Sequence, residues 1–184
     1  KDGGYVDNVA GASLSGNHRN DDPGYNVVDE NQNEYGTLGG RIMFAFKFNE
    51  NWNALLTVVT ENSELDGTWA TDPLLGDYKV TRFIDENRED DWLSGSLTLE
   101  GDLGFANLVV SATRLERDIT YNWDNDVYTQ YKDRYYGNGY NANGKLYGLY
   151  NTEYNRSFIF NDQSQERDTV EIRLASKGES RLQW

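Results

Sequence analysis

Hydrophobic and polar side chains alternate along several stretches of the chain. In the first stretch, which begins at Gly40, the apolar positions are Ile42, Phe44, Phe46 and Phe48. After a short polar turn, the same spacing recurs at Trp52, Ala54, Leu56 and Val58. Side chains two residues apart share one face of an extended strand. The pattern therefore predicts two β-strands, each with one apolar face.

Two later parts of the chain repeat this design. One pair of stretches has its apolar positions at Leu93, Leu97 and Leu99, and then at Leu108, Val110 and Ala112. The closing stretch has Val170, Ile172 and Leu174, followed by a turn and a second strand that has barely begun at Trp184. No stretch has the i, i+3, i+4, i+7 spacing of an amphipathic helix. We predict an all-β chain, an antiparallel meander of about seven strands.

The connections between these strands alternate in length. Short turns are expected at 49–51, 101–104 and 177–180, and long connections at 11–36, 61–91 and 118–167. Compact soluble domains rarely contain structureless loops longer than about 15 residues. Outer-membrane barrels have short turns at one rim, long loops at the other, and strands with an apolar outer face. The fold class predicted is therefore an antiparallel meander that forms part of an outer-membrane β-barrel.

Aromatic residues near the expected strand ends favour the same fold. Interfacial girdles of such barrels are rich in aromatic side chains, and the candidates here are Phe48, Trp52, Trp92, Phe105 and Trp184. A soluble β-sandwich with decorated loops remains the alternative. In that fold, the apolar faces would form a core instead of contacting lipid.

Composition narrows the classes of function. The formal net charge is -14, which argues against nucleic acid or anionic lipid as a partner. The mean hydropathy is -0.81, and no run approaches the roughly 18 apolar residues of a spanning helix. Cysteine is absent, so disulfides and thiolate metal sites are excluded. Most of the 31 acidic residues lie within 19–36, 61–91 and 116–168, which leaves the expected membrane-depth strands nearly free of acid.

Several short segments also resemble TonB-dependent outer-membrane receptors. They share order and spacing with such receptors, and they are Gly4–Val9, Gly39–Ile42, Ser164–Glu166, Glu171–Ser176, Gly178 and Leu182–Trp184. The resemblance implies a single segment, 1–184, of a receptor β-barrel without the plug domain. In such receptors a further barrel strand follows the Trp, so the chain is expected to be a fragment.

The function implied by the resemblance is energy-coupled uptake of a scarce solute such as a siderophore, cobalamin or an oligosaccharide. It implies no catalysis and no cofactor. The implied partners are TonB, reached through parts of the receptor outside this chain, the cargo, and the lipid of the bacterial outer membrane.

The third long connection suggests residues that contact cargo. Residues 121–140 mix aromatic rings with amide and guanidinium donors, which suits sugar rings or aromatic chelators. The candidates, one of them from the second long connection, are Trp69, Trp123, Tyr128, Tyr131, Arg134, Tyr135, Tyr136 and Tyr140. The alternative is that these side chains only fold the loop onto itself.

Other motifs give weaker signals. Asp85–Asp91 is dense in oxygen ligands, but it lacks the spacing of a Ca²⁺ loop, so no metal site is predicted. His18 is the only histidine, which leaves little basis for a catalytic triad or a zinc site. Two alternatives to the receptor remain: a soluble carbohydrate-binding β-sandwich, and a glycoside hydrolase that uses two of the carboxylates.

Overall fold

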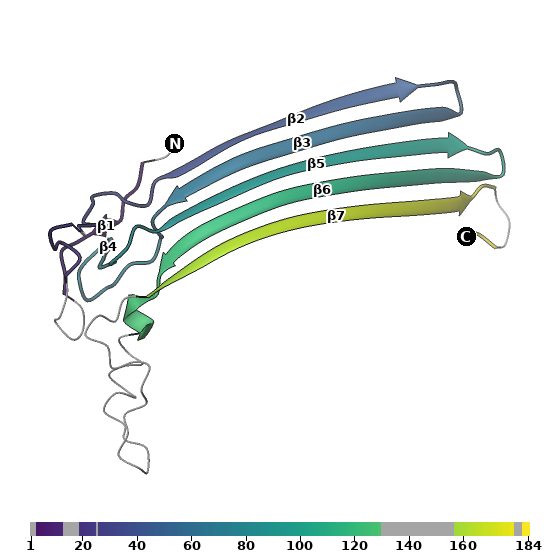
Figure 1. Cartoon of the computed structure of the whole chain (residues 1–184). Coiled ribbons are helices and arrows are strands. Elements are labelled where there is room, and N and C mark those ends of the chain that lie inside the picture. The colour runs from purple at the N-terminus through teal and green to yellow at the C-terminus, as the bar shows by residue number, and fades with distance from the viewer. Residues whose placement is uncertain (1–2, 13–18, 25, 130–156, 179–181) are drawn as a thin grey trace, which may run out of the picture. The chain divides into compact units, whose positions relative to one another are not determined.

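A computed structural model describes residues 3–12, 19–24, 26–129, 157–178 and 182–184. Five long strands make one antiparallel sheet in the order β2-β3-β5-β6-β7 (Figure 1). Their bounds are β2 Tyr35–Lys47, β3 Trp52–Asp66, β5 Asn87–Asp102, β6 Ala106–Asp124 and β7 Phe158–Ser176. A second, two-stranded parallel sheet joins β1, Asp7–Asn8, to β4, Lys79–Val80. The antiparallel β-meander predicted from the alternation is confirmed.

Tight turns connect β2 to β3 and β5 to β6 at or next to the predicted positions, and the turn predicted at 177–180 lies partly outside the described residues. The strands extend further into the long connections than expected. β3 continues to Asp66, and β5 begins at Asn87, so the second long connection shrinks to 67–86. β6 continues to Asp124 and β7 starts at Phe158. Both faces are mostly polar in the extensions of β3 and β5, so the alternation of apolar and polar residues is weak there. In β6 the alternation continues through Ile119, Tyr121 and Trp123, and β7 begins with Phe158, Ile159 and Phe160. Backbone pairing with the neighbouring strands persists where the alternation is weak. Many acidic residues expected in loops therefore lie in strands.

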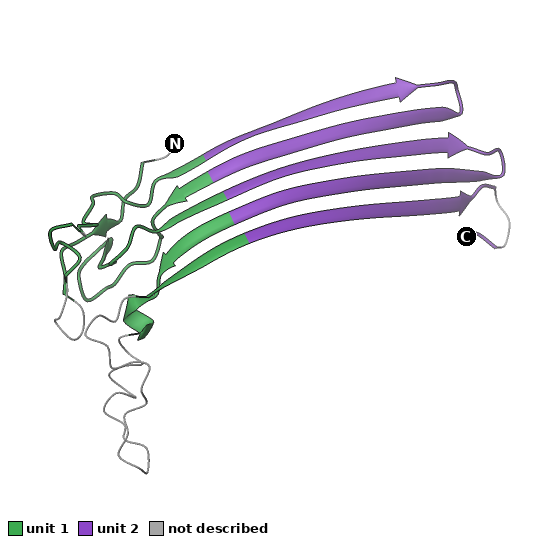
Figure 2. Ribbon diagram, in the orientation of Figure 1, with its two compact units in different colours: residues 1–36, 64–89, 120–162 green, residues 37–63, 90–119, 163–184 purple. Residues whose placement is uncertain are grey.

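The chain divides into two compact units (Figure 2). Unit 1 comprises 1–36, 64–89 and 120–162, which are the long connections and the strand ends that enter them. Unit 2 comprises 37–63, 90–119 and 163–184, which are the remaining parts of the strands and the tight turns. The five long strands pass through both units.

Unit 1 has a small core in which asparagines replace much of the usual apolar packing. Val6, Val80 and Phe83 are buried, together with Asn8 and Asn20. The Asn8 amide donates to the Val27 carbonyl (2.6 Å) and accepts from the Arg82 backbone N–H (2.8 Å). Buried polar groups are tolerated when they are hydrogen-bonded. Segments that look like polar loops in the sequence thus pack as a folded lobe.

Unit 2 is a single layer of strands in which both edge strands are exposed. Side chains of β2 and β7 are exposed almost throughout this unit, and Ala54 and Ala106 are its buried apolar residues among those described. The two faces of the layer differ in chemistry.

Candidate functional site

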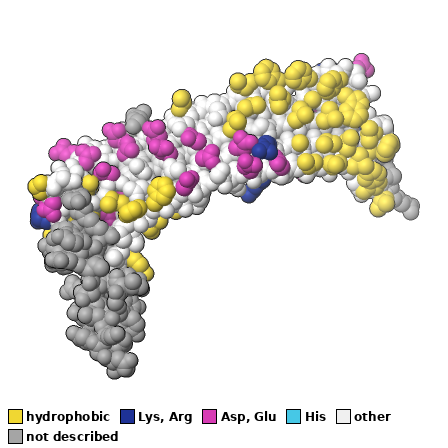
Figure 3. Space-filling model, viewed as in Figure 1, with side chains coloured by type: hydrophobic (Ala, Val, Ile, Leu, Met, Phe, Trp, Pro, Cys, Tyr) yellow, Lys and Arg dark blue, Asp and Glu magenta, His cyan; other side chains and the backbone are white. Residues whose placement is uncertain are grey.

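One face of unit 2 carries a continuous set of exposed hydrophobic side chains, which we name the apolar band. Its exposed fractions run from 42% at Leu174 to 70% at Val170. Figure 3 shows hydrophobic side chains gathered over the strand ends near the tight turns. The most exposed members are Ile42, Phe44, Phe46, Phe48, Leu93, Leu97, Val170, Ile172 and Leu174. An exposed apolar surface of this kind marks contact with another phase or molecule.

The opposite face of unit 2 is mainly polar, and several of its side chains hydrogen-bond across strands. Its apolar members are Met43, Leu55, Val59, Val109 and Leu115. Asn53 on β3 donates to Glu100 on β5 (3.2 Å), and the Thr98 and Ser111 hydroxyls lie 3.1 Å apart. Glu171 and Arg173 of β7 form an ion pair on the same face. The period-two pattern thus sorts apolar and polar residues onto separate faces, as the sequence predicts.

An ion-pair cluster marks where the apolar band ends. The Arg114 guanidinium on β6 lies 2.7 Å from Glu116, 3.2 Å from Glu166 and 3.4 Å from Asp168. Asp168 is two residues before Val170, so both side chains belong to the same face. Beyond this cluster acidic side chains predominate on the face (Figure 3), although Leu38, Phe158 and Phe160 are exposed there too. The cluster therefore marks a change from mainly apolar to mainly charged surface.

Trp52 packs its ring against the backbone of Gly101 at the tight-turn end of the band. A Cβ at Gly101 would lie 2.5 Å from the Trp52 ring. Aromatic coverage of a glycine is a known way to stabilise a strand without a side chain of its own. The pair fixes Trp52 at the rim of the apolar face.

Replacing Gly101 tests its packing against the Trp52 ring. Gly101→Ala is expected to destabilise the protein by about 1–3 kcal/mol, because the new methyl overpacks the Trp52 ring. Gly95→Ala on the same strand is the control, since nothing lies within 4 Å of its Cβ position. Urea unfolding in micelles, followed by Trp fluorescence, compares the two. Equal shifts of the midpoint would contradict the packing.

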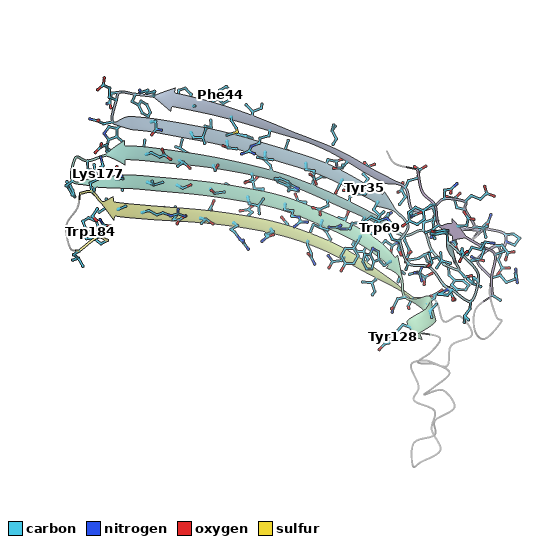
Figure 4. All side chains as sticks on the ribbon, turned by 180° about the vertical axis from the view of Figure 1, so that it is seen from behind. Tyr35, Phe44, Trp69, Tyr128, Lys177 and Trp184 are labelled. Atoms are coloured by element: carbon cyan, nitrogen blue, oxygen red, sulfur yellow. The ribbon has the colours of Figure 1, made fainter. Side chains whose placement is uncertain are left out.

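Unit 1 contains two aromatic pairs at strand ends. The Tyr35 and Trp69 rings have centroids 6.3 Å apart and planes at 68°. The Tyr121 and Trp123 rings are 5.1 Å apart at 44°. Trp69 is 60% exposed and Trp123 is 43% exposed, so both indoles present surface to a ligand. Figure 4 labels Tyr35 and Trp69 beside each other.

The cargo candidates from the sequence fall into two groups. Trp69 and Trp123 each belong to an aromatic pair, and Tyr128 is exposed at a helical turn that begins at Asp126. Outside the described residues lie Tyr131, Arg134, Tyr135, Tyr136 and Tyr140. The sequence alone does not point to Tyr35 and Tyr121. Each takes part in the alternation of its strand, but the strands expected from the sequence end before they reach these residues.

Carboxylates in unit 1 accept hydrogen bonds from backbone N–H groups and so connect separate segments of the chain. Glu86 accepts a hydrogen bond from the Asp124 N–H (3.0 Å) and pairs with Arg82 (3.2 Å). Asp124 in turn accepts from the Phe83 and Asp126 N–H groups. Among the described residues, no group of His, Asp or Glu side chains is arranged to hold a metal ion. These contacts give Glu86 and Asp124 a structural role.

Glu86 also makes unit 1 sensitive to pH. Burial raises the pKa of Glu86 above its ordinary value, and the charge of Arg82 opposes the rise. A raised pKa means that stability is fully present below the ordinary value and falls as pH rises through the folded-state pKa. Glu86→Gln keeps an acceptor for the Asp124 N–H and removes the titration. We expect the wild type to lose stability over this window and the variant to lose much less.

Urea unfolding is measured at a series of pH values from acidic to neutral. Hydrogen exchange of the unit 1 amides is used to monitor the unfolding. Asp21→Asn serves as the control, because Asp21 is exposed and the pKa of its carboxyl is lowered by Arg19. A wild type whose stability rises through the same window would contradict the assignment.

Among the described residues, the structure has no helix long and apolar enough to cross a membrane. Comparison with family models, with curated proteins and with solved structures finds no match for this chain.

Proposed function

We propose that this chain is part of the wall of an outer-membrane β-barrel, in a receptor of the TonB-dependent kind that imports a scarce solute. The observation that carries the proposal is the exposed apolar band on one face of unit 2, opposite a hydrogen-bonded polar face. In a barrel wall, lipid covers the apolar face and the polar face lines the lumen.

The extent of the band supports contact with lipid. Along β2 and into the following turn the band runs from Ile42 to Phe48, and Leu38 continues the same face beyond it. A tilted strand needs about 9–11 residues to span a bilayer. Exposed Phe48, Phe105 and Trp184 lie at the tight-turn end, where an aromatic girdle is expected. The Arg114 cluster bounds the band on the other side.

A soluble β-sandwich would bury this face. Phe44, Phe46 and Ile172 would then be core residues, whereas each is more than half exposed. The glycoside hydrolase alternative would need two carboxylates across a cleft, and the buried Glu86 and the half-buried Asp124 instead accept backbone hydrogen bonds. The charged cluster at one end of the apolar band and the aromatic residues at the other end favour lipid as the phase that covers this face.

The receptor class rests on the resemblance of the short segments, Ser164–Glu166 and Glu171–Ser176 among them. It adds TonB as the energy-transducing partner and a siderophore, cobalamin or oligosaccharide as cargo. Uptake that persists in cells without TonB would contradict this part of the proposal.

Lipid contact is tested with single-Trp variants in vesicles that contain brominated lipid. Trp52 lies on the apolar face and Trp92 on the polar face, by the alternation along β3 and β5. We expect strong quenching of a variant that retains only Trp52 and weak quenching of one that retains only Trp92. Equal quenching, or a chain that stays soluble without detergent and unfolds cooperatively, would contradict the barrel.

A further inference from the structure

We propose that a groove in the apolar band binds one acyl chain of a phospholipid with a primary ammonium headgroup, and that the carboxylates around Arg114 bind this ammonium. The inference rests on the proposed function, because it takes the apolar band as the surface that faces lipid. It names the kind of lipid that this surface selects.

The groove lies in unit 2 and is formed by residues of β3, β5, β6 and β7. Its volume is about 400 Å³, which falls within the range of about 300–1,000 Å³ that is usual for ligand sites. The apolar side chains that line it come from three neighbouring strands and from β7. They are Leu56, Leu97, Ala112 and Val170.

Two small residues on adjacent strands leave this groove in the face. At the turn between β5 and β6, Leu103 N donates to Ala106 O, and the antiparallel ladder that follows places Leu97 opposite Ala112. Gly95 is therefore diagonal to Ala112 on the same face. A Cβ at Gly95 would meet nothing within 4 Å. The floor of the groove is thus open at the glycine.

An acyl chain suits a groove of this chemistry, because it is a flexible run of methylene groups without polar atoms. Surrounding lipid tails are as apolar as a leucine side chain, so the hydrophobic effect does not favour one apolar contact over another within the membrane. Selection of one lipid must therefore come from the shape of the groove and from the headgroup that the chain carries.

The charged side of the groove is acidic overall. Arg114 and Asp168 both line it. The Arg114 guanidinium is paired with Glu116 (2.7 Å), Glu166 (3.2 Å) and Asp168 (3.4 Å). Three carboxylates around one guanidinium leave negative charge in excess. Each carboxylate has more lone pairs than its contact with Arg114 uses, so it can accept from a further donor.

This charge selects among headgroups. An ammonium at the end of the band meets the surplus carboxylates, whereas an anionic headgroup meets like charge. A primary ammonium also donates hydrogen bonds to carboxylates, which a trimethylammonium cannot do, and charge-assisted hydrogen bonds are the stronger kind. Phosphatidylethanolamine and phosphatidylcholine carry the same phosphate, so a comparison of the two isolates the ammonium.

The test is native mass spectrometry of the full chain in detergent micelles. The chain is titrated with phosphatidylethanolamine, phosphatidylcholine and phosphatidylglycerol that have identical acyl chains. We expect the first phosphatidylethanolamine to bind about tenfold more tightly than either of the others. Glycerophosphoethanolamine, which has the headgroup but no acyl chain, should not bind.

Two variants test the groove and the charge separately. Gly95→Leu fills the groove and should weaken phosphatidylethanolamine about tenfold. Gly40→Leu is the matched control, because Gly40 lies on the same face of β2 outside the groove and a Cβ there also meets nothing within 4 Å. Glu166→Gln combined with Asp168→Asn keeps acceptors for Arg114 and should abolish most of the preference over phosphatidylcholine. Circular dichroism of each variant confirms the strand content.

Equal binding of the three phospholipids by the wild type would overturn the selection, and unchanged binding in Gly95→Leu would overturn the groove. A dimer that Gly95→Leu abolishes would make a second copy the occupant and would also overturn the proposal. Quenching of Trp52 by brominated lipid is measured on the same proteins in vesicles. Quenching without a headgroup preference contradicts only the groove, whereas a preference without quenching contradicts the barrel wall.

Discussion

Leu97→Arg is expected to lower the free energy of unfolding in lipid vesicles by about 2–4 kcal/mol, the cost of an arginine on the lipid face near the bilayer midplane. Leu97 is 51% exposed and lies within the apolar band, between Leu93 and the tight turn at 103–105. The nearest charged groups on this face belong to the Arg114 cluster, in which the carboxylates of Glu116, Glu166 and Asp168 are already paired with Arg114.

The adjacent residue supplies the control. Thr98 points to the opposite face, where its hydroxyl lies 3.1 Å from that of Ser111. Thr98→Arg therefore places the same charge on the same strand at nearly the same depth, but on the polar face. Its cost is expected to remain within about 1 kcal/mol, the loss of one hydrogen bond. Urea unfolding in vesicles gives both values.

The difference between the two variants is the informative quantity. Backbone propensity and strand position are nearly the same for both, so a large difference reports what each face contacts. Equal losses would mean that the two faces meet similar surroundings, as in a sheet exposed to water on both sides. A larger loss for Thr98→Arg would place the protein core on the polar face and would contradict the barrel wall.

The strands of the apolar band could be predicted from the sequence because one face there is uniformly hydrophobic. Phe44 and Phe46 alternate with Ala45 and Lys47, and that contrast fixes both the element and the face. Where the contrast ends, as from Thr60 to Asp66, the sequence looks like a loop. The structure keeps it in β3, because pairing with a neighbouring strand satisfies the backbone whatever the side chains are.

The candidate site was predictable only in part for a related reason. Trp69 and Trp123 stand out by residue type, but their partners Tyr35 and Tyr121 become relevant only through register. The pairing of Tyr35 with Trp69 depends on where the second long connection leaves the sheet. Spacing within one strand carries no such information.

The folded lobe of unit 1 was the least predictable part, since polar loops give no periodic signal. Its central residue is Asn8, which is 1% exposed and forms part of β1. Its Nδ2 donates to Val27 O and Arg82 O, and its Oδ1 accepts from the Arg82 N–H and from Asn20. Three segments far apart in the sequence thus meet at one side chain.

Asn8→Ala is therefore expected to destabilise unit 1 by about 3 kcal/mol, because several hydrogen bonds are lost and buried partners are left unpaired. Amides in 6–9, 19–29 and 79–83 should exchange about a hundredfold faster, since each tenfold change corresponds to about 1.4 kcal/mol. Amides in 90–119, which belong to unit 2, should change little. Hydrogen exchange with mass spectrometry resolves the three segments separately.

Two further variants separate hydrogen bonding from loss of volume. Asn8→Asp has the same shape, but its carboxylate cannot donate to Val27 O or Arg82 O, so it should be as harmful as alanine. Asn26→Ala removes an exposed asparagine that only accepts from Val28 N (3.2 Å), and such surface changes stay within about 0.5 kcal/mol. If Asn8→Asp behaved like the wild type, shape alone would hold the lobe, and the donor role of Asn8 would be wrong.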